Sequence, residues 1–600
     1  MRSAFVPPRR PSDLVRYLIP SLLVAAFLFF YTSDIDFFSS RLATGSHPID
    51  SLIRAAEKSF TDTLAKETFT LADAATAYRE RRGRHPPPGF DAWHKFAAER
   101  NAIVVEDFWD QIYNDLEPFW GLKPARIRKD AWDFEMRISV RNGKATAESD
   151  WFWTQIWLHM IRTIEHLLPD MDLALNAMDE PRMVVPWEEM KDLMDLAEET
   201  RTMPDARGVI SDWAKRPGLG RDVEPDEKTT DKAWEHTRPY WLIARRGCPN
   251  SSLTRHARTL RNFTRTPMIA SPFSLSHMHH GFVANTTLAA DFCNQPDLQA
   301  LNGIFVEPLS VSATKVLFPM FGGSKLAVNN DILLPAPMYW SAEERFMGTE
   351  EDAAIRWEDK LDGVIWRGVA TGGKNTAHNW RSFQRHRFVA MNNGSAVSMA
   401  EKEGRVENFV LPANGYELRA QENKQLGEWV EQWSDVRFVD LMCDTADGEK
   451  EGGCDYAERF FQVGWGMTMA EQFGYKYLPD IDGNSFSGRY LGFLRSTSLP
   501  IKATLWREWH DSRLTAWKHF VPMDNRYGDW YGIMEYFLGY EDKGGHDEIA
   551  KRIALGGREW AHRVLRREDM QIYVLRLLLE YARVSDDKRE QMGWVEDLVE

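Results

Sequence analysis

The stretch Tyr475–Arg495 constrains the fold most, because it changes from strand-like to helix-like through a polar turn. Its first part, YKYLPDI, contains the tyrosines and aliphatic residues that suit a buried strand. Asp482, Gly483 and Asn484 then favour a turn, and a helix is predicted over Phe486–Arg495. The apolar run Ser498–Ala503 predicts the next strand. Strands that alternate with helices indicate an α/β fold with a parallel sheet.

The same stretch predicts an anion-binding site. The first N–H groups of a helix have no intrahelical partner and carry partial positive charge, so they bind phosphate well. Arg489 lies one turn into the predicted helix, where a guanidinium can bind two phosphate oxygens. A nucleotide pocket at the carboxyl edge of a parallel sheet is therefore indicated. An ordinary β-α-β unit is an equally good interpretation, because a phosphate fingerprint contains more glycines.

Three segments of this region, DIDGNSFSGRY, SLPIKATLWREW and LTAWKHFVP, follow one another in that order. Together they resemble the donor-binding half of glycosyltransferase family 90, which includes fungal capsule-associated xylosyltransferases and Rumi-type protein O-glucosyltransferases. The resemblance extends from about His85 to about Arg583. It implies a GT-B-like α/β fold of two Rossmann-like lobes and an inverting, metal-independent transfer from UDP-glucose or UDP-xylose. The expected UDP contacts in this segment are Asn484, Ser485, Phe486, Ser487, Gly488 and Arg489.

A second wall of the donor pocket is predicted after the strand-like run Gly363–Trp366. The loop from Arg367 to Gly373 is rich in small residues, which let the backbone approach a diphosphate. The resemblance implies that Gly368 in this loop and one following arginine contact UDP. The sequence leaves open whether that arginine is Arg381 or Arg385.

A general base is predicted in the first half of the chain. Leu173–Asn176 suits a short buried strand, and Asp179 follows it just before Pro181. A carboxylate at the end of a central strand points into a cleft more readily than into a core. LPDMDLALNAMDEP is similar to the family segment whose Asp deprotonates the acceptor hydroxyl, and Asp179 is the matching residue.

No metal or other cofactor is expected. Asp480 and Asp482 form a DxD pattern, which is the metal signature of a different glycosyltransferase fold. The cluster His277, His279 and His280 is not completed by a carboxylate at helical spacing, so a structural loop is favoured over a metal site. Glu508 suits either the ribose hydroxyls or a buried ion pair.

Length and charge limit the other partners. A chain of 600 residues exceeds what one core usefully buries, so two or more domains are expected. The formal net charge of −15 argues against nucleic acid as a partner, because like charge opposes a polyphosphate backbone. The expected partners are a UDP-sugar, a glycan or glycoprotein acceptor, and a membrane.

The membrane is expected to hold the N-terminus. Tyr17–Tyr31 contains no charged residue, four arginines precede it, and acidic residues follow. This asymmetry predicts a type II signal anchor with the body in the Golgi or ER lumen, although a cleaved signal peptide is the alternative. The predicted parts are a cytosolic tail 1–16, an anchor 17–31, a stem 32–60, a helical collar 61–145, an acceptor lobe 146–340, a UDP-sugar lobe 341–545 and C-terminal helices 546–600.

Sequons and cysteines agree with a lumenal location. Acceptor sequons for N-glycosylation occur at Asn250, Asn262, Asn285 and Asn393. Cys443 and Cys454 flank a polar loop that cannot build a core, which favours a local disulfide between them. Four buried free thiols are the alternative.

Two other functions remain open at this stage. A catalytically silent, membrane-tethered protein that binds glycans or UDP is compatible with Val369, which stands where animal members of the family carry a serine. A glycoside hydrolase needs a second acid near Asp179. Glu180 is adjacent in sequence, but on a strand it would face away from Asp179.

Overall fold

The structure is a computed structural model that describes residues 47–216, 230–236, 239–404, 406–412, 416–443 and 454–599. The chain separates into two compact units, Met1–Leu52 and Ile53–Glu600. Of the first unit only residues 47–52 are described, and they belong to the start of helix α2 (Pro48–Leu64). The two large sheets, the helices that follow α2 and the candidate site described below lie within the second unit.

The first half of the second unit is built on a five-stranded mixed sheet with strand order β2-β1-β3-β6-β7. β1 pairs antiparallel with β2 and β3, whereas β3, β6 and β7 run parallel. β3 is buried along its whole length, as its apolar sequence MDLAL predicts for a central strand. The elements of this half are β1 (Arg137–Arg141), β2 (Lys144–Ala147), α7 (Phe152–Arg162), β3 (Met171–Leu175), α8 (Trp187–Glu199), α9 (Trp241–Ala244), α10 (Leu253–His256), β4 (Met278–His279), β5 (Phe282–Val283), α11 (Thr286–Ala290), α12 (Gly303–Val306), β6 (Met320–Gly322) and β7 (Ile332–Leu333).

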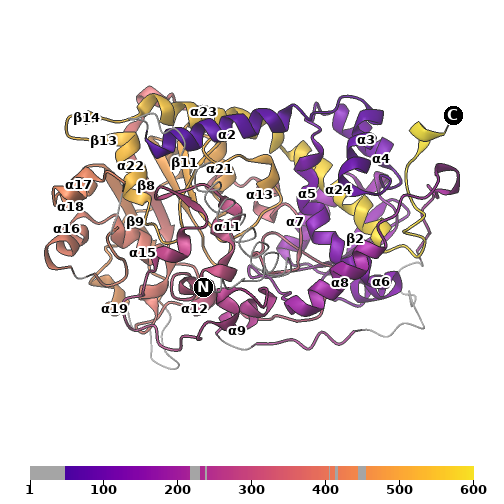
Figure 1. Cartoon of the computed structure of the whole chain (residues 1–600), viewed down its shortest axis with the longest axis horizontal. Helices are drawn as coiled ribbons and strands as arrows, with labels where there is room; N and C mark the ends of the chain where they lie inside the picture. The colour runs from indigo at the N-terminus through magenta and orange to yellow at the C-terminus, as the bar shows by residue number, and fades with distance from the viewer. Residues whose placement is uncertain are drawn as a thin grey trace, which may run out of the picture. The chain divides into compact units, whose positions relative to one another are not determined.

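The second half contains a five-stranded sheet of order β12-β11-β10-β8-β9, in which every pair of neighbouring strands is parallel. The prediction of an α/β fold with a parallel sheet is confirmed here, and Figure 1 shows helices flanking these strands. The elements are α13 (Pro337–Ser341), α14 (Glu344–Met347), β8 (Leu361–Val369), α15 (Gln384–Met391), α16 (Gly394–Glu403), α17 (Arg419–Glu422), α18 (Leu426–Trp433), β9 (Ser434–Asp440), α19 (Asp455–Glu458), α20 (Met469–Gln472), β10 (Tyr475–Ile481), α21 (Tyr490–Arg495), β11 (Leu499–Ala503), β12 (Val521–Pro522), α22 (Trp530–Leu538), β13 (Gly539–Tyr540) and β14 (Lys543–Gly544).

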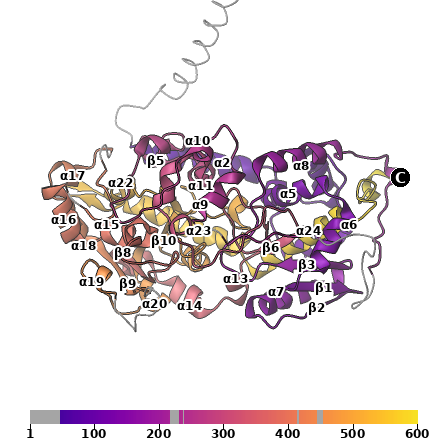
Figure 2. The same ribbon diagram turned by 90° about the horizontal axis from the view of Figure 1, so that it is seen from below.

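The last long helix returns to the first half of the chain. α23 (Asp547–Val564) packs beside α21 and β11, and α24 (Arg567–Val584) then lies among the N-terminal helices, as Figures 1 and 2 both show. Tyr581 Oη donates to the backbone oxygen of Asp172 in β3 (2.9 Å). The helices around α24 are α3 (Leu71–Arg82), α4 (Phe90–Ala98), α5 (Asp110–Leu116) and α6 (Pro124–Trp132). We call α24 and these four helices, with the loops that join the four, the collar.

Two predictions about local structure are wrong. α21 begins at Tyr490, four residues after the predicted start, so Arg489 is the N-cap residue of a short helix. The Gly483 N–H donates to the Ser485 oxygen (2.8 Å) and the Tyr490 N–H to the Ser487 oxygen (3.3 Å), which makes residues 483–489 a series of turns. The predicted helix N-terminus at Phe486 is therefore absent.

The second error concerns the end of β8. Gly368 was expected in a loop, but it lies inside β8, paired with Phe438 of β9. A Cβ at Gly368 would approach the ring of Trp366 to 2.8 Å, so this position requires glycine. The strand therefore continues to Val369, and the loop begins later than predicted.

The membrane prediction falls on residues that the structure does not cover. The apolar run 17–31 and the predicted tail lie outside the described residues. Among the described residues, no helix is long and apolar enough to cross a bilayer.

Both pairs of cysteines form disulfides. Cys443 bonds to Cys454, as the spacing favoured, and Cys248 bonds to Cys293, a pair that the spacing did not predict. The asparagines of all four sequons are exposed at the surface. Two of them also cap helices, because Asn285 Oδ1 accepts the Leu288 N–H (3.0 Å) and Asn393 Oδ1 accepts the Ala396 N–H (2.9 Å).

Candidate active site

Asp179 lies in a short loop that follows β3. Asn176 shapes this loop, since its Oδ1 accepts the Met178 N–H (3.0 Å) and its Nδ2 donates to the Glu180 oxygen (2.9 Å). The carboxylate of Glu180 turns away and accepts hydrogen bonds from the backbone and hydroxyl of Ser310 (3.0 and 2.7 Å). Asp179 is thus the half-buried acid of the loop that faces the second half of the chain.

Asp179 meets the predicted donor segment through Asn484. The Nδ2 of Asn484 donates to Asp179 Oδ2 at 3.4 Å, across 305 positions of sequence. Burial raises the pKa of Asp179, and the hydrogen bond from Asn484 opposes part of this rise. A carboxylate from the first half and a turn from the second half therefore share one site.

The amide oxygen of Asn484 accepts hydrogen bonds from two glycines. Asn484 Oδ1 accepts the N–H groups of Gly372 and Gly373, both at 3.0 Å. These glycines have φ values of +125° and +124°, which side chains rarely tolerate. A Cβ at Gly373 would also lie 2.1 Å from the Glu307 oxygen. Two adjacent N–H groups directed at one oxygen form the kind of backbone concavity that binds anions.

Arg385 links the ends of strands β8 and β10 next to this glycine loop. Its buried guanidinium donates to the backbone oxygens of Val369, Ile481 and Asp482 and to the hydroxyl of Thr371, at 2.6–3.1 Å. Burial, and then the charge of Arg489, lower the pKa of Arg385 to about 9. Arg385 therefore joins the carboxyl ends of β8 and β10 and sets the position of the glycine loop.

Arg489 lies close to Arg385 and keeps part of its guanidinium uncommitted. Its Nη1 donates to the Arg367 oxygen (2.5 Å), whereas its Nη2 is buried and has no hydrogen-bond partner among the residues that the structure describes. The guanidinium also stands over the rings of Trp366 and Phe493, at 5.4 Å from each centroid. Burial lowers the pKa of Arg489, and Asp480 opposes that change.

The segment between Asn484 and Arg489 packs against helix α13. Phe486 contacts the ring of Tyr339 edge-on, with 5.6 Å between centroids, and the Ser487 oxygen accepts a hydrogen bond from Tyr339 Oη (3.5 Å). A Cβ at Gly488 would lie 2.5 Å from the sulfur of Met338. Ser485 is buried, and its backbone oxygen closes the turn that begins at Gly483. These residues therefore hold the turn in place from the side of α13.

Arg381 does not contact the segment Asn484–Arg489 but pairs with Glu407. It forms an ion pair with Glu407 (2.7 Å) and stands over the ring of Trp380. Glu407 and Trp380 line a cavity of about 1370 Å³, whose lining contains neither Asp179 nor any residue of the Asn484–Arg489 segment. Of the two arginines that the sequence left open, only Arg385 lies at the ends of β8 and β10.

The two acids of the DxD pattern are buried behind the site. Asp480 Oδ2 pairs with Lys502 Nζ (3.0 Å), and Asp482 Oδ2 accepts the Leu505 N–H (2.9 Å). Within the described ranges, the Oδ1 atom of each has no hydrogen-bond partner. Burial raises the pKa of Asp482 to about 7. Both acids are therefore directed at groups of the protein itself.

Glu508 and His277 also have structural partners. Glu508 accepts from Tyr339 Oη (2.8 Å) and pairs with Lys502 (3.4 Å). Burial alone would raise the pKa of Glu508, but His510 and Lys502 together lower it to about 2. His277 is buried, with its Nε2 2.7 Å from Asp524 Oδ2. These contacts favour the buried ion pair for Glu508 and the structural interpretation for His277.

Three residues of the site were not singled out by sequence reasoning. Gly372 and Gly373 were part of a loop, but their N–H groups were not predicted to converge on one acceptor. The Gly-Gly pair was the available signal, since it permits the observed backbone. Thr371, whose hydroxyl binds Arg385, had no distinguishing signal.

Comparison with known proteins covers the C-terminal quarter of the chain. Residues 456–596 match the family described as Glycosyl transferase family 90. Protein O-glucosyltransferase 2 of Danio rerio is 30% identical over 134 residues, which cover 22% of this chain and 26% of that protein. Protein O-glucosyltransferase 3 of Mus musculus is 32% identical over 123 residues, 20% of this chain and 23% of that protein. The chain thus aligns with about a quarter of the length of these relatives, and the family resemblance expected from the motifs is confirmed over residues 456–596.

Proposed function

Since residues 456–596 match glycosyl transferase family 90, we propose that this chain is an inverting glycosyltransferase. It transfers glucose or xylose from a UDP-sugar to a hydroxyl group of a glycan or glycoprotein. The observation that carries the proposal is the contact between Asp179 and Asn484, which brings a carboxylate of the first half to the predicted donor segment. The relatives that the chain matches are named protein O-glucosyltransferases, which supports a hydroxyl acceptor.

In this proposal Asp179 is the general base. The acceptor hydroxyl gives its proton to an oxygen of Asp179 as the new glycosidic bond forms, because the hydroxyl becomes acidic only in the transition state. Burial makes Asp179 a stronger base than an exposed aspartate. The Asn484 amide keeps the carboxylate ionised and oriented toward the second half of the chain.

The leaving UDP is stabilised on the other side of the sugar. Negative charge grows on the diphosphate during transfer, so donors fixed before the reaction lower the barrier. Arg489 supplies a guanidinium with a free Nη2, and Gly372 and Gly373 supply two converging N–H groups. Asn484 Oδ1 occupies those N–H groups in this structure, and a diphosphate oxygen takes its place when the donor binds.

The proposed reaction needs no metal ion. In the proposed GT-B arrangement, each of the two five-stranded sheets forms one lobe. Arg489 and the glycine loop neutralise the diphosphate, while Asp480 and Asp482 serve Lys502 and the backbone. The mixed sheet forms the acceptor lobe and the parallel sheet the donor lobe, with the active site at Asp179. A secretory location in the Golgi or ER is supported by the two disulfides and the four exposed sequons.

The variant Asp179→Asn tests the base. It keeps the size of the side chain, so UDP affinity should stay unchanged while transfer falls by about 10²–10⁴-fold, the usual contribution of a general base. UDP affinity is measured by calorimetry, and transfer by UDP release with a panel of UDP-sugars and glycan acceptors. Glu180→Gln is the matched control, because this acid lies in the same loop but binds Ser310, and it should retain transfer. Full turnover in Asp179→Asn would disprove the assignment.

Arg489→Ala tests the donor side of the site. Losing a charge-assisted contact to the diphosphate should weaken UDP binding at least tenfold and reduce transfer as well. Together the two variants separate the roles, since only the change at Arg489 should affect affinity for UDP. Unchanged UDP affinity in Arg489→Ala would place the diphosphate elsewhere.

A further inference from the structure

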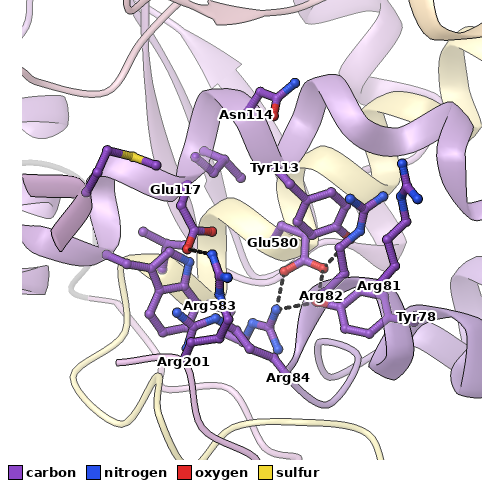
Figure 3. Close-up of a pocket in the computed structure, with 14 residues that line it drawn as sticks. Tyr78, Arg81, Arg82, Arg84, Tyr113, Asn114, Glu117, Arg201, Glu580 and Arg583 are labelled. Atoms are coloured by element: carbon purple, nitrogen blue, oxygen red, sulfur yellow. Dashed lines mark hydrogen bonds and ion pairs between the residues drawn. The ribbon is translucent and has the colours of Figure 1, made fainter. Parts of the chain in front are cut away.

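A second polar pocket lies in the collar, away from Asp179. It has a volume of about 290 Å³, which is close to the lower limit of about 300 Å³ for small-molecule sites. Its lining contains five arginines and two carboxylates. Figure 3 shows these side chains around the pocket. The charged residues of the lining are Arg81, Arg82, Arg84, Arg201, Arg583, Glu117 and Glu580.

Most of these arginines are paired with acids, and Arg84 is the exception. Arg201 pairs with Glu117 (2.6 Å), and Arg583 pairs with Glu580. Arg84 is 5% exposed and forms no ion pair with any described carboxylate. Its guanidinium donates to the oxygens of Ala197 and Thr200 and lies 3.7 Å above the ring of Trp120. These acceptors are neutral, and the charge of Glu117, which is paired with Arg201, compensates Arg84 only in part.

The positive groups of the pocket repel one another. Burial, and then the charge of Arg583, lower the pKa of Arg84 to about 10, and Arg201 acts in the same direction. Arg583 is 2% exposed, and its Nε is buried without a hydrogen-bond partner among the described residues. The lining therefore combines a cation that lacks an ion-pair partner in the described part of the chain with an unused donor.

We propose that this collar pocket binds a tetrahedral oxyanion, the phosphate or sulfate group of a small molecule. Arg84 follows α3, Arg201 follows α8, and Arg583 belongs to α24, so three guanidinium groups come from three elements. A planar carboxylate is matched by one guanidinium, whereas an anion with three or more oxygens can use several. The site is independent of the proposed transfer reaction, because Asp179 and the glycine loop are not part of its lining.

Calorimetry with inorganic phosphate and with sulfate, on the full chain at constant ionic strength, tests the proposal. Arg201→Gln removes a partly exposed guanidinium, 35% exposed, so the fold should survive, and binding should weaken about tenfold. Arg100→Gln is the matched control, since Arg100 is 30% exposed in the same collar but does not line the pocket, and it should bind normally.

Two further arms complete the experiment. Arg489→Ala should retain phosphate binding, which distinguishes the collar pocket from the proposed donor site. Acetate should bind at least tenfold more weakly than phosphate. Equal weakening in Arg201→Gln and Arg100→Gln would show general surface attraction and overturn the proposal. Absence of phosphate and sulfate binding, or acetate binding as tight as phosphate, would also overturn it.

Discussion

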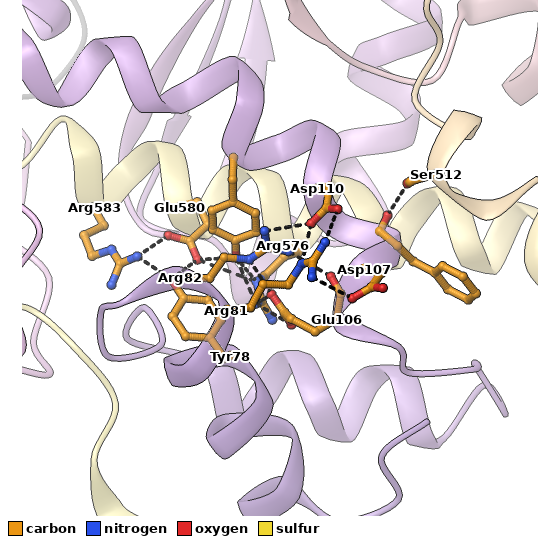
Figure 4. Close-up of polar contacts among 12 residues, drawn as sticks. Tyr78, Arg81, Arg82, Glu106, Asp107, Asp110, Ser512, Arg576, Glu580 and Arg583 are labelled. Atoms are coloured by element: carbon orange, nitrogen blue, oxygen red, sulfur yellow. Dashed lines mark hydrogen bonds and ion pairs between the residues drawn. The ribbon is translucent and has the colours of Figure 1, made fainter. Parts of the chain in front are cut away.

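The collar and the candidate active site both bury charged groups, but they treat their carboxylates differently. In the collar, Glu580 accepts from the hydroxyls of Tyr78 and Tyr113 (2.8 Å each). It also pairs with Arg583, as Figure 4 shows. Both oxygens of Glu580 therefore have partners. Behind the candidate site, Asp480 and Asp482 each have one oxygen without a partner in the described part of the chain. Glu580 in the collar thus has a partner for each carboxylate oxygen, whereas Asp480 and Asp482 have a partner for only one.

This difference gives the carboxyl groups of Glu580 and Asp482 opposite pKa shifts. A buried carboxylate whose two oxygens both have partners stays ionised and fixes the helices around it. Burial raises the pKa of Glu580, but the charges of Arg583 and Arg576 outweigh burial, so this pKa lies below its ordinary value. A carboxylate with an unpaired oxygen is costly to ionise, and burial raises the pKa of Asp482 to about 7. Unsatisfied groups of this kind concentrate where a protein does chemistry.

Breaking the collar network should have the largest effect on stability. Glu580→Gln removes the shared partner of Arg576 and Arg583, so the buried Arg583 loses its ion pair, while Arg576 keeps only Glu106. The expected loss is about 3–5 kcal/mol, measured by urea denaturation followed through tryptophan fluorescence. Glu188→Gln, which breaks an exposed pair with Arg255, should cost under about 1 kcal/mol. Similar losses in the two variants would contradict the distinction between the collar and the surface.

Asn484→Ala should have an intermediate effect, on activity. The change removes the hydrogen bond to Asp179 and the acceptor of the two glycine N–H groups. Transfer should fall about tenfold, the equivalent of about 1.4 kcal/mol. The Asn484 hydrogen bond lowers the pKa of Asp179, so its loss should raise that pKa and move the acid limb of the pH–rate profile to higher pH. An unmoved acid limb would show that Asn484 does not act on Asp179.

The smallest effect should appear in the pH dependence of stability. The pKa of Asp482 is about 7 in the folded chain and about 4 in the unfolded chain, so the folded state binds more protons between these values. Stability should therefore fall as pH rises from about 4 to about 7. Asp482→Asn still accepts the Leu505 N–H and cannot titrate. The difference in the free energy of unfolding between Asp482→Asn and wild type should therefore be more favourable to the variant at pH 7.5 than at pH 5, by on the order of 1 kcal/mol. Urea denaturation at each pH measures it. An equal difference at both pH values would refute the shift.

The parts of the fold that depend on local pattern were predictable. The bounds of β10 match the prediction, because an apolar run between a glycine and a polar turn suits only a central strand. The start of α21 was missed, because packing against Met338 and Tyr339 holds residues 486–488 out of a helix. No local pattern contains that contact, which joins segments about 150 residues apart.

The candidate site was predictable to the level of segments but not of individual contacts. Family resemblance selected Asp179 and the Asn484–Arg489 segment, and these meet in the structure. The choice between Arg381 and Arg385 depended on Glu407, whose pairing with Arg381 no spacing rule reveals. The collar pocket was not anticipated, because its arginines come from residues 81–84, 201 and 583, which only the tertiary fold brings together.

The return of α24 to β3 affects the order in which the chain matures. Tyr581 and Asp172 are separated by 409 positions, so β3 leaves the ribosome long before the helix that covers it. At about 5–20 residues per second, the delay is roughly 20–80 s. During this interval the apolar surface of the first sheet lacks its native cover and is open to chaperones. Folding of the earliest-made sheet is thereby coupled to translation of the last helix.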